Sequence, residues 1–97
     1  MDMIEKLVHE LTEKKLTISF MESASGGGLA NAVTNVEGAS EVLGFSAVTY
    51  SNEFKIKMGV PQEVILKYTV YSMETAREMA RSIKEFSHSS IGVGVTG

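Results

Sequence analysis

The first part of the chain repeats its apolar residues with a helical period. Ile4, Leu7, Val8 and Leu11 recur at intervals of three and four residues, which places them on one face of a helix over about residues 2–14. The residues between them are mostly charged. This pattern predicts an amphipathic helix that packs on the rest of the domain through one apolar stripe.

Three short runs of apolar residues have the composition of strands. Each is rich in β-branched, aromatic or other apolar residues and is bounded by turn residues. The expected strands are "LTISFM" at 16–21, "LGFSAVTY" at 43–50, and "SIGVGVTG" at 90–97, which runs into a glycine turn. The first of these runs is apolar enough to be a buried strand.

Helical segments separate these strands. The expected helices cover about residues 26–35, a short stretch between the N-cap Ser51 and Gly59, a turn opened by Pro61, and a long helix capped by Ser72. The segment "TNVEGAS" is expected to be a loop. The order helix, strand, helix, strand, helices, strand favours an α/β fold with helices layered around a largely parallel sheet.

Length and composition narrow the class of protein. With 97 residues, 43% of them hydrophobic and 22% charged, residues 1–97 are expected to form one globular domain. The net charge is −3 and the nine basic residues are scattered, so nucleic acid is not an expected partner. The chain has no cysteine, and His9 and His88 are far apart, so no metal site is expected. No run resembles a signal peptide or a membrane span, and we expect a cytoplasmic chain without a membrane partner.

The stretch "ESASGGGLANAV" at residues 22–33 raises the question of chemistry. Three glycines at a helix start cost stability unless something must approach the backbone closely. Free N–H groups and the helix dipole at such a turn favour a phosphate or a developing oxyanion. The spacing fits neither common phosphate-loop motif, and close packing of the helix on a sheet explains the glycines equally well. Ligands of parallel sheets bind beyond the carboxyl ends of the strands, where this turn, "TYSNEFK" and "VTG" are all expected.

Two serines of this stretch are candidate nucleophiles. Ser25 is placed to cap the helix or to touch a phosphate, whereas Ser23 follows the strand and is freer to face the crevice. Neither histidine is well placed as a base, but Lys55 can serve if burial lowers its pKa, and Tyr50 could orient it or relay a proton. Position alone leaves the ordinary alternatives open, a capping or solvated serine and a surface lysine.

Three phrases together resemble one family. "ESASGGGLANAVTNVEGAS", "FSAVTYSNEFKIKMGV" and "IGVGVTG" are similar to the C-terminal domain of the competence/damage-inducible protein CinA, whose stand-alone members are nicotinamide-nucleotide amidases. The family forms are close to E-S-C-T-G-G, V-T-Y-S-N-E-x-K and a T/S-G that ends a strand. The resemblance runs from about Leu11 to Gly97. It implies the α/β fold of that domain, incomplete because family members continue past the equivalent of Gly97 through further strands and a closing helix.

The resemblance also implies an activity. The expected reaction is hydrolysis of the carboxamide of nicotinamide mononucleotide to nicotinate mononucleotide and ammonia, in pyridine-nucleotide salvage, without metal or cofactor. The implied catalytic residues are Ser23 as nucleophile, Lys55 as general base, and the hydroxyls of Tyr50 and Thr96 in support, and the implied substrate-binding residues are Ser25, Gly26 and Gly27. Two small replacements depart from the family: Ala24 stands where cysteine is usual and Ser25 where threonine is common.

Two other functions remain open at this point. One is a non-catalytic phosphate- or nucleotide-binding module that keeps the glycine turn, which predicts phosphate affinity that survives Ser23→Ala. The other is a piece that folds only as an oligomer, which predicts exposed apolar sheet edges and concentration-dependent folding. The amidase predicts a Lys55 of lowered pKa beside Ser23. The expected partners are a small nucleotide substrate and further copies of the chain in a homo-oligomer.

Overall fold

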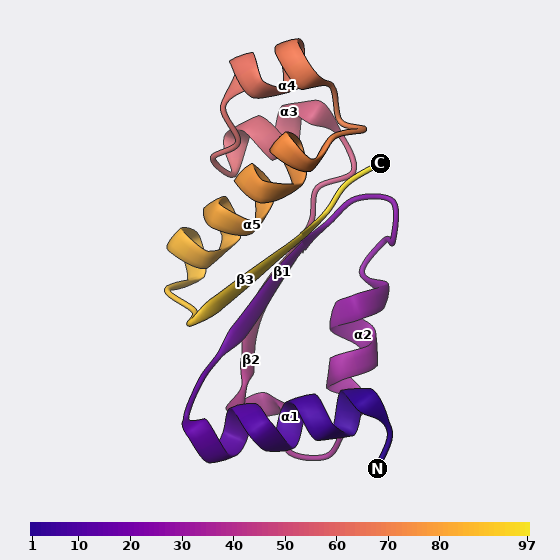
Figure 1. Ribbon diagram of the computed structural model, residues 1–97, viewed down its shortest axis with the longest axis vertical. Helices are drawn as coiled ribbons and strands as arrows, with labels where there is room; N and C mark the ends of the chain where they lie inside the picture. Colours follow the sequence, from indigo (N-terminus) through magenta and orange to yellow (C-terminus); the bar gives the residue numbers. More distant parts are fainter.

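A three-stranded parallel sheet runs through the computed structural model of residues 1–97, with helices on both of its faces (Figure 1). The elements in chain order are α1 (Met3–Lys14), β1 (Ile18–Glu22), α2 (Gly28–Thr34), the 3-10 turn η1 (Ala39–Glu41), β2 (Leu43–Val48), α3 (Asn52–Lys57), α4 (Gln62–Tyr68), α5 (Met73–Ser87) and β3 (Ile91–Val95). The α/β class with helices layered around a parallel sheet, expected from the sequence, is confirmed.

The strand β1 lies at the centre of the sheet, whose order is β2-β1-β3. All five residues of β1 are buried, as is typical of a parallel strand covered on both faces. The register pairs Glu22 with Val48 on one side and with Val95 on the other. The three strands therefore end at the same level, and the segments that follow them meet at one edge of the sheet.

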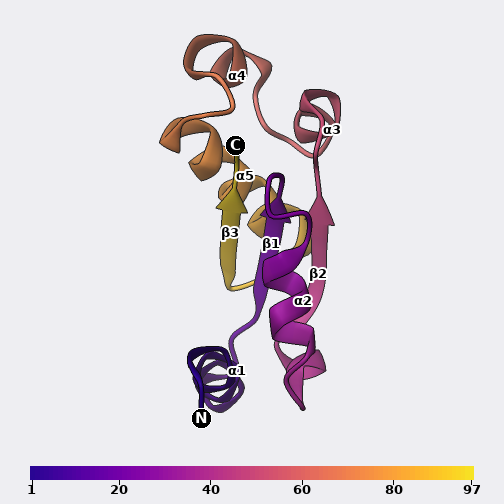
Figure 2. The same cartoon turned by 90° about the vertical axis from the view of Figure 1, so that its right-hand side faces the viewer.

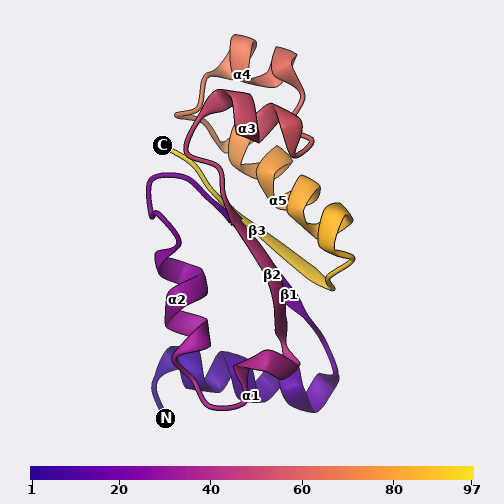
Figure 3. The same cartoon turned by 180° about the vertical axis from the view of Figure 1, so that it is seen from behind.

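Two layers of helices enclose the sheet. Figure 2 shows the strands pointing the same way, with α2 in front of them and α5 behind, and Figures 1 and 3 show α3 and α4 beyond the carboxyl ends of the strands. One core cluster consists of Val8, Leu11, Ile18, Phe20, Val33, Ala39 and Val42. The other consists of Met21, Val60, Ile65, Met79 and Ile83. The adjacent residues Phe20 and Met21 of β1 enter opposite clusters because side chains alternate across a strand.

The helix α5 packs directly on β3 because two residues of that strand have no side chain. A Cβ atom added at Gly92 would lie 2.2 Å from the carbonyl oxygen of Ala80, and one added at Gly94 would lie 2.2 Å from that of Ala76. Real side chains do not fit at such distances, so these glycines permit a close approach of helix and strand. The sequence indicates the strand but not this contact.

The helix ends follow the sequence expectations with two differences. Ser51 and Ser72 cap α3 and α5 as expected, each accepting a backbone N–H at 3.2 Å through its hydroxyl. The helix α2 begins at Gly28, later than expected, because Gly26 and Gly27 have φ angles of +61° and +94°, which a right-handed helix excludes. The short turn η1 begins within the expected loop after α2 and extends one residue past it. None of the helices combines the length and the apolar character needed to cross a membrane.

Candidate active site

The candidate site lies where the three strands end. Backbone pairing continues past the strands, since the N–H of Ser23 donates to the carbonyl of Val95 at 2.8 Å and the N–H of Thr49 donates to the carbonyl of Glu22 at 2.8 Å. The chain around Ser23 is therefore held from both sides. Ligands of parallel sheets bind beyond the carboxyl ends of the strands, so Ser23 stands where a ligand is expected.

Ser23 and Lys55 form the central pair of the site. The Nζ atom of Lys55 lies 3.0 Å from the Oγ atom of Ser23. Their exposed fractions are only 1% for Lys55 and 4% for Ser23. The two residues are 32 positions apart, and they meet because β2 ends level with β1 and the cap Ser51 starts α3 at that point. The structure thus brings together the two residues that the sequence analysis assigned as nucleophile and base.

Burial shifts Lys55 toward the neutral form of its amine. Its Nζ atom also donates to the carbonyl oxygens of Thr49 at 2.8 Å and Tyr50 at 3.4 Å, and it takes part in none of the ion pairs of the structure. Burial lowers the pKa of Lys55 because the charged form loses its hydration. A neutral amine in this place can donate its two hydrogens to the carbonyls and accept the Ser23 hydroxyl with its lone pair. That is the arrangement of a general base.

The carboxylate of Glu22 lies at the start of α2, where the glycine turn predicts an anion. Its buried carboxylate accepts hydrogen bonds from the Ser25 hydroxyl at 2.7 Å and from the backbone N–H groups of Leu29 and Ala30 at 2.9 Å each. Burial by itself raises the pKa of Glu22, but the hydrogen bonds from Ala30, Ser25, Leu29 and Gly27 outweigh it and hold the pKa below its ordinary value. The anion at the start of α2 is therefore the chain's own carboxylate, which sequence reasoning missed.

The glycines serve the turn that carries Ser23. The N–H of Gly26 donates to the carbonyl of Ser23 at 3.0 Å, and the N–H of Gly28 donates to that of Ser25 at 3.0 Å. A Cβ atom at Gly27 would meet the side chain of Val48 at 3.3 Å. Most donors of the turn are thus engaged within the chain, and so is the Ser25 hydroxyl. A substrate-binding role for Ser25, Gly26 and Gly27 stays a prediction.

Tyr50 and Thr96 lie beside the pair without contacting it through their hydroxyls. The side chain of Tyr50 is 77% exposed, and only its carbonyl oxygen reaches Lys55. The hydroxyl of Thr96 donates to the carbonyl of Val70 at 2.5 Å. The structure therefore does not bring these two hydroxyls to Ser23. Their catalytic roles stay predictions.

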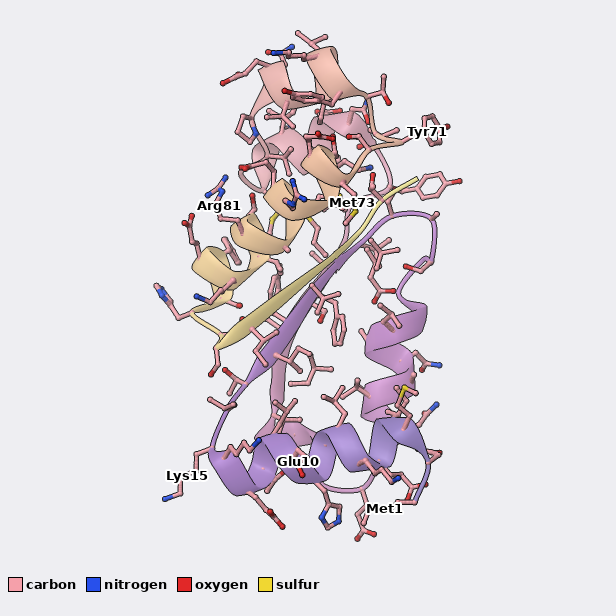
Figure 4. All side chains as sticks on the ribbon, in the orientation of Figure 1. Met1, Glu10, Lys15, Tyr71, Met73 and Arg81 are labelled. Carbon is pink, nitrogen blue, oxygen red and sulfur yellow. The ribbon has the colours of Figure 1, made fainter.

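The site contains an unpaired buried hydroxyl and lies outside five of the surface hollows. Thr49, which is 2% exposed, has a buried hydroxyl without a hydrogen-bond partner, although its carbonyl holds Lys55. Neither Ser23 nor Lys55 lines any of five surface hollows of about 300 to 400 Å³. Figure 4 shows Tyr71 projecting outward at the end of the sheet where the site lies, with Glu10 at the opposite end on α1. The pair of Ser23 and Lys55 is thus covered by the chain and lies outside these five hollows.

Comparison with known proteins decides the family. The family model described as the CinA C-terminal domain matches residues 1–97. The chain belongs to the CinA C-terminal domain family. The resemblance drawn from the phrases around Ser23, Lys55 and Thr96 is thereby confirmed.

Curated relatives of the CinA family align with nearly all of this chain in sequence. It is 48% identical over 96 residues to a competence-damage inducible protein of Alkaliphilus oremlandii, covering 97% of this chain and 23% of the relative. It is 46% identical over 94 residues to one of Caldicellulosiruptor bescii, covering 96% of this chain and 23% of the relative. The chain therefore spans 23% of the length of these relatives.

Solved CinA structures share the fold. A competence-damaged protein (CinA) superfamily protein from Escherichia coli superposes with a TM-score of 0.86 at 29% identity, over 89% of this chain and 51% of that one. The competence/damage inducible protein CihA from Agrobacterium tumefaciens gives a TM-score of 0.74 at 32% identity, over 91% of this chain and 55% of that one. The layered α/β architecture is that of the CinA family, and the match covers about half of each solved chain.

Proposed function

We propose that this chain carries the reactive core of an amidohydrolase that converts nicotinamide mononucleotide to nicotinate mononucleotide and ammonia. The observation that carries the proposal is the 3.0 Å distance between Ser23 Oγ and Lys55 Nζ. The lysine is buried and has no carboxylate partner, which is how a lysine is tuned to act as a base. The substrate follows from the resemblance to the CinA amidases.

The proposed reaction is an acyl transfer through Ser23. Neutral Lys55 takes the hydroxyl proton as Ser23 Oγ adds to the carboxamide carbon, and the protonated amine then gives that proton to the leaving nitrogen, so ammonia departs. Water next adds to the acyl-enzyme while Lys55 takes a proton from it. Return of this proton to Ser23 Oγ releases the carboxylic acid and restores both residues. Neither metal nor cofactor is needed for these steps.

Two backbone donors are available for the tetrahedral oxyanion. The N–H groups of Ala24 and Ser25 directly follow the nucleophile, and neither donates a hydrogen bond within the chain. The neighbouring donors of Gly26, Gly28, Leu29 and Ala30 are all engaged. Preorganised N–H groups beside the reacting carbon are commonly the largest electrostatic contribution in such reactions. We therefore assign the oxyanion to Ala24 and Ser25.

The engaged start of α2 favours the amidase over a phosphate-binding module. Such a module would use the free N–H groups of the glycine turn and the helix, but the carboxylate of Glu22 already accepts from Leu29 and Ala30. A negative group at this point also repels a phosphate. A nucleotide-binding module without chemistry would need donors elsewhere in the chain.

The proposal includes association of the chain with copies of itself. Apolar side chains are exposed along the sheet edge β2 and beyond its end: Phe45 is 41% exposed, Val48 54% and Phe54 53%. A second copy that covered them would bury apolar surface and could also wall the site. The proposed place of the reaction is the cytoplasm, where the sequence analysis expects the chain.

Ammonia release from nicotinamide mononucleotide tests the proposal. The purified chain should release ammonia, whereas Ser23→Ala should lower the rate about a thousandfold or more, to background. Lys57→Met serves as the control and should release ammonia at the parent rate. Lys57 lies on the same helix as Lys55 but pairs with Glu53 on the surface. No release by a folded parent chain, or equal release by Ser23→Ala, would reject the proposal.

A further inference from the structure

Glu22 has no step in the proposed chemistry, yet it is the one buried acidic side chain of the protein, 1% exposed. It directly precedes Ser23 and turns its carboxylate toward the start of α2. There it accepts three hydrogen bonds of 2.7 to 2.9 Å, from Ser25, Leu29 and Ala30. Burying a carboxylate is costly unless such bonds compensate it. The cost of burying this acid directly before the proposed nucleophile suggests that its carboxylate has a function there.

The three bonds close the loop that carries the nucleophile. Leu29 and Ala30 follow Glu22 by seven and eight residues, so one side chain ties the end of β1 to the first turn of α2. Within this loop the backbone of Ser23 is fixed at both ends, since its N–H donates to Val95 and its carbonyl accepts from Gly26. The position of Ser23 Oγ beside Lys55 depends on the shape of this loop.

We propose that Glu22 is a positioning residue whose carboxylate locks the loop between β1 and α2. In the locked loop Ser23 Oγ stays 3.0 Å from Lys55 Nζ, and the N–H groups of Ala24 and Ser25 stay free. The inference rests on the proposed function, because it gives Glu22 a part in keeping that nucleophile ready. A misplacement of about 1 Å can cost about a hundredfold in rate, so a loosened loop should be measurable.

The charged form of Glu22 is what the loop requires. Its Oε1 atom accepts from Ser25 and Leu29, and its Oε2 atom accepts from Ala30. An amide of the same size has only one oxygen, and its NH₂ group would face an N–H donor of α2. Glu22→Gln therefore keeps the volume and removes the lock.

A matched control is available at the other end of the molecule. Asp2 also caps a helix, since its carboxylate accepts from the N–H of Glu5 at 2.8 Å at the start of α1. Figure 1 shows this end of the chain far from the carboxyl ends of the strands. Asp2→Asn thus changes a cap by the same chemistry without reaching the loop of Ser23.

The experiment measures how fast Ser23 is labelled by a small alkyl fluorophosphonate. In this reaction the Ser23 Oγ–P bond forms, the P–F bond breaks, fluoride leaves, and the hydroxyl proton passes to Lys55. The labelling of parent, Glu22→Gln and Asp2→Asn would be followed by mass spectrometry under conditions where circular dichroism shows each to be folded. In Glu22→Gln the maximal labelling rate should fall about ten- to a hundredfold while the half-saturating probe concentration stays unchanged. Asp2→Asn should be labelled at the parent rate.

The outcomes separate this inference from the proposed function. Labelling of folded Glu22→Gln at the parent rate overturns the inference, as does a parent chain that is not labelled at all. If Glu22→Gln does not fold, Ser25→Ala decides, because it removes one bond to Glu22 at an exposed position. It should slow the maximal rate about three- to tenfold, and an unchanged rate overturns the inference. Labelling that depends on Glu22 without any ammonia release rejects the amidase and leaves the positioning role standing.

Discussion

The Nζ atom of Lys55 donates a 2.8 Å hydrogen bond to the carbonyl oxygen of Thr49, the residue that follows β2 by one position. This bond ties the amine to the end of the sheet, and the neighbouring carbonyl of Tyr50 lies 3.4 Å away. A neutral amine can donate its two hydrogens to these two carbonyls, which leaves its lone pair for the hydroxyl of Ser23. The proposed role of the pair therefore depends on whether the buried Lys55 is neutral.

The pH dependence of ammonia release should follow Lys55. Burial lowers the pKa of Lys55 below its ordinary 10.5, and only the neutral amine can accept the proton of Ser23. The value of kcat/KM for nicotinamide mononucleotide should rise with pH and level off at a pH below that ordinary value. Lys55→Arg should abolish the activity at every pH, since a guanidinium stays charged. A rising limb at the ordinary lysine pKa would contradict the account.

Acid should destabilise the protein through Glu22. The folded-state pKa of Glu22 is lowered below its unfolded value of 4.5, so its contribution to stability is fully present above that pH and is lost as the pH falls through the folded pKa. At neutral pH Glu22→Gln should reduce the free energy of unfolding by about 1 to 3 kcal/mol. Urea unfolding at several pH values checks this. The parent and the variant should converge in acid, and a difference that is constant with pH would contradict the prediction.

The close packing of α5 on β3 should make Gly94 intolerant of a side chain. A Cβ atom there would lie 2.2 Å from the Ala76 carbonyl, so Gly94→Ala must push helix and strand apart and should cost about 2 to 4 kcal/mol. Gly44→Ala in β2 is the control, because a Cβ atom at Gly44 meets nothing within 4 Å; it should change stability by less than about 0.5 kcal/mol. Equal denaturation midpoints for the two variants would contradict this packing.

Two buried threonines should respond oppositely to replacement by valine. The hydroxyl of Thr49 has no partner, so Thr49→Val should raise the free energy of unfolding by about 1 kcal/mol. The hydroxyl of Thr75 donates to the Thr69 carbonyl at 2.6 Å, so Thr75→Val should lower it by about 1 to 3 kcal/mol. Thermal unfolding of both variants checks the contrast. Loss of stability in Thr49→Val would show that its hydroxyl has a partner in solution.

The sequence predicted the elements well and the contacts between them less well. Periodicity and caps located the helices, and alternating helices and strands implied the parallel sheet whose carboxyl ends bring Ser23 to Lys55. Tyr50 was expected to end a strand facing the site, but β2 ends at Val48 and Tyr50 turns into solvent. Tyr50 directly precedes Ser51, the cap of α3, and the strand pattern does not show where the strand gives way to that cap.

Some contacts between segments that are separate in the sequence could not be predicted from the sequence. A glycine turn before a helix indicates an anion, but no pattern tells whether that anion is a ligand or a carboxylate of the chain such as Glu22. A signal was present in hindsight, because α2 has no acidic residue in its own first turn and Glu22 ends the strand before it. The glycines of β3 likewise show their purpose only against the backbone of α5.

The most direct test of the account is an NMR titration of the lysine side chains. With lysine labelled at Cε, the signal of Lys55 is the one that disappears in Lys55→Met. Lys55 should lose its proton at a pH below the ordinary lysine value of 10.5, because burial lowers its pKa. If Lys55 titrates at that ordinary value or above it, Lys55 is an ordinary charged side chain, and the pair with Ser23 is not a nucleophile and its base.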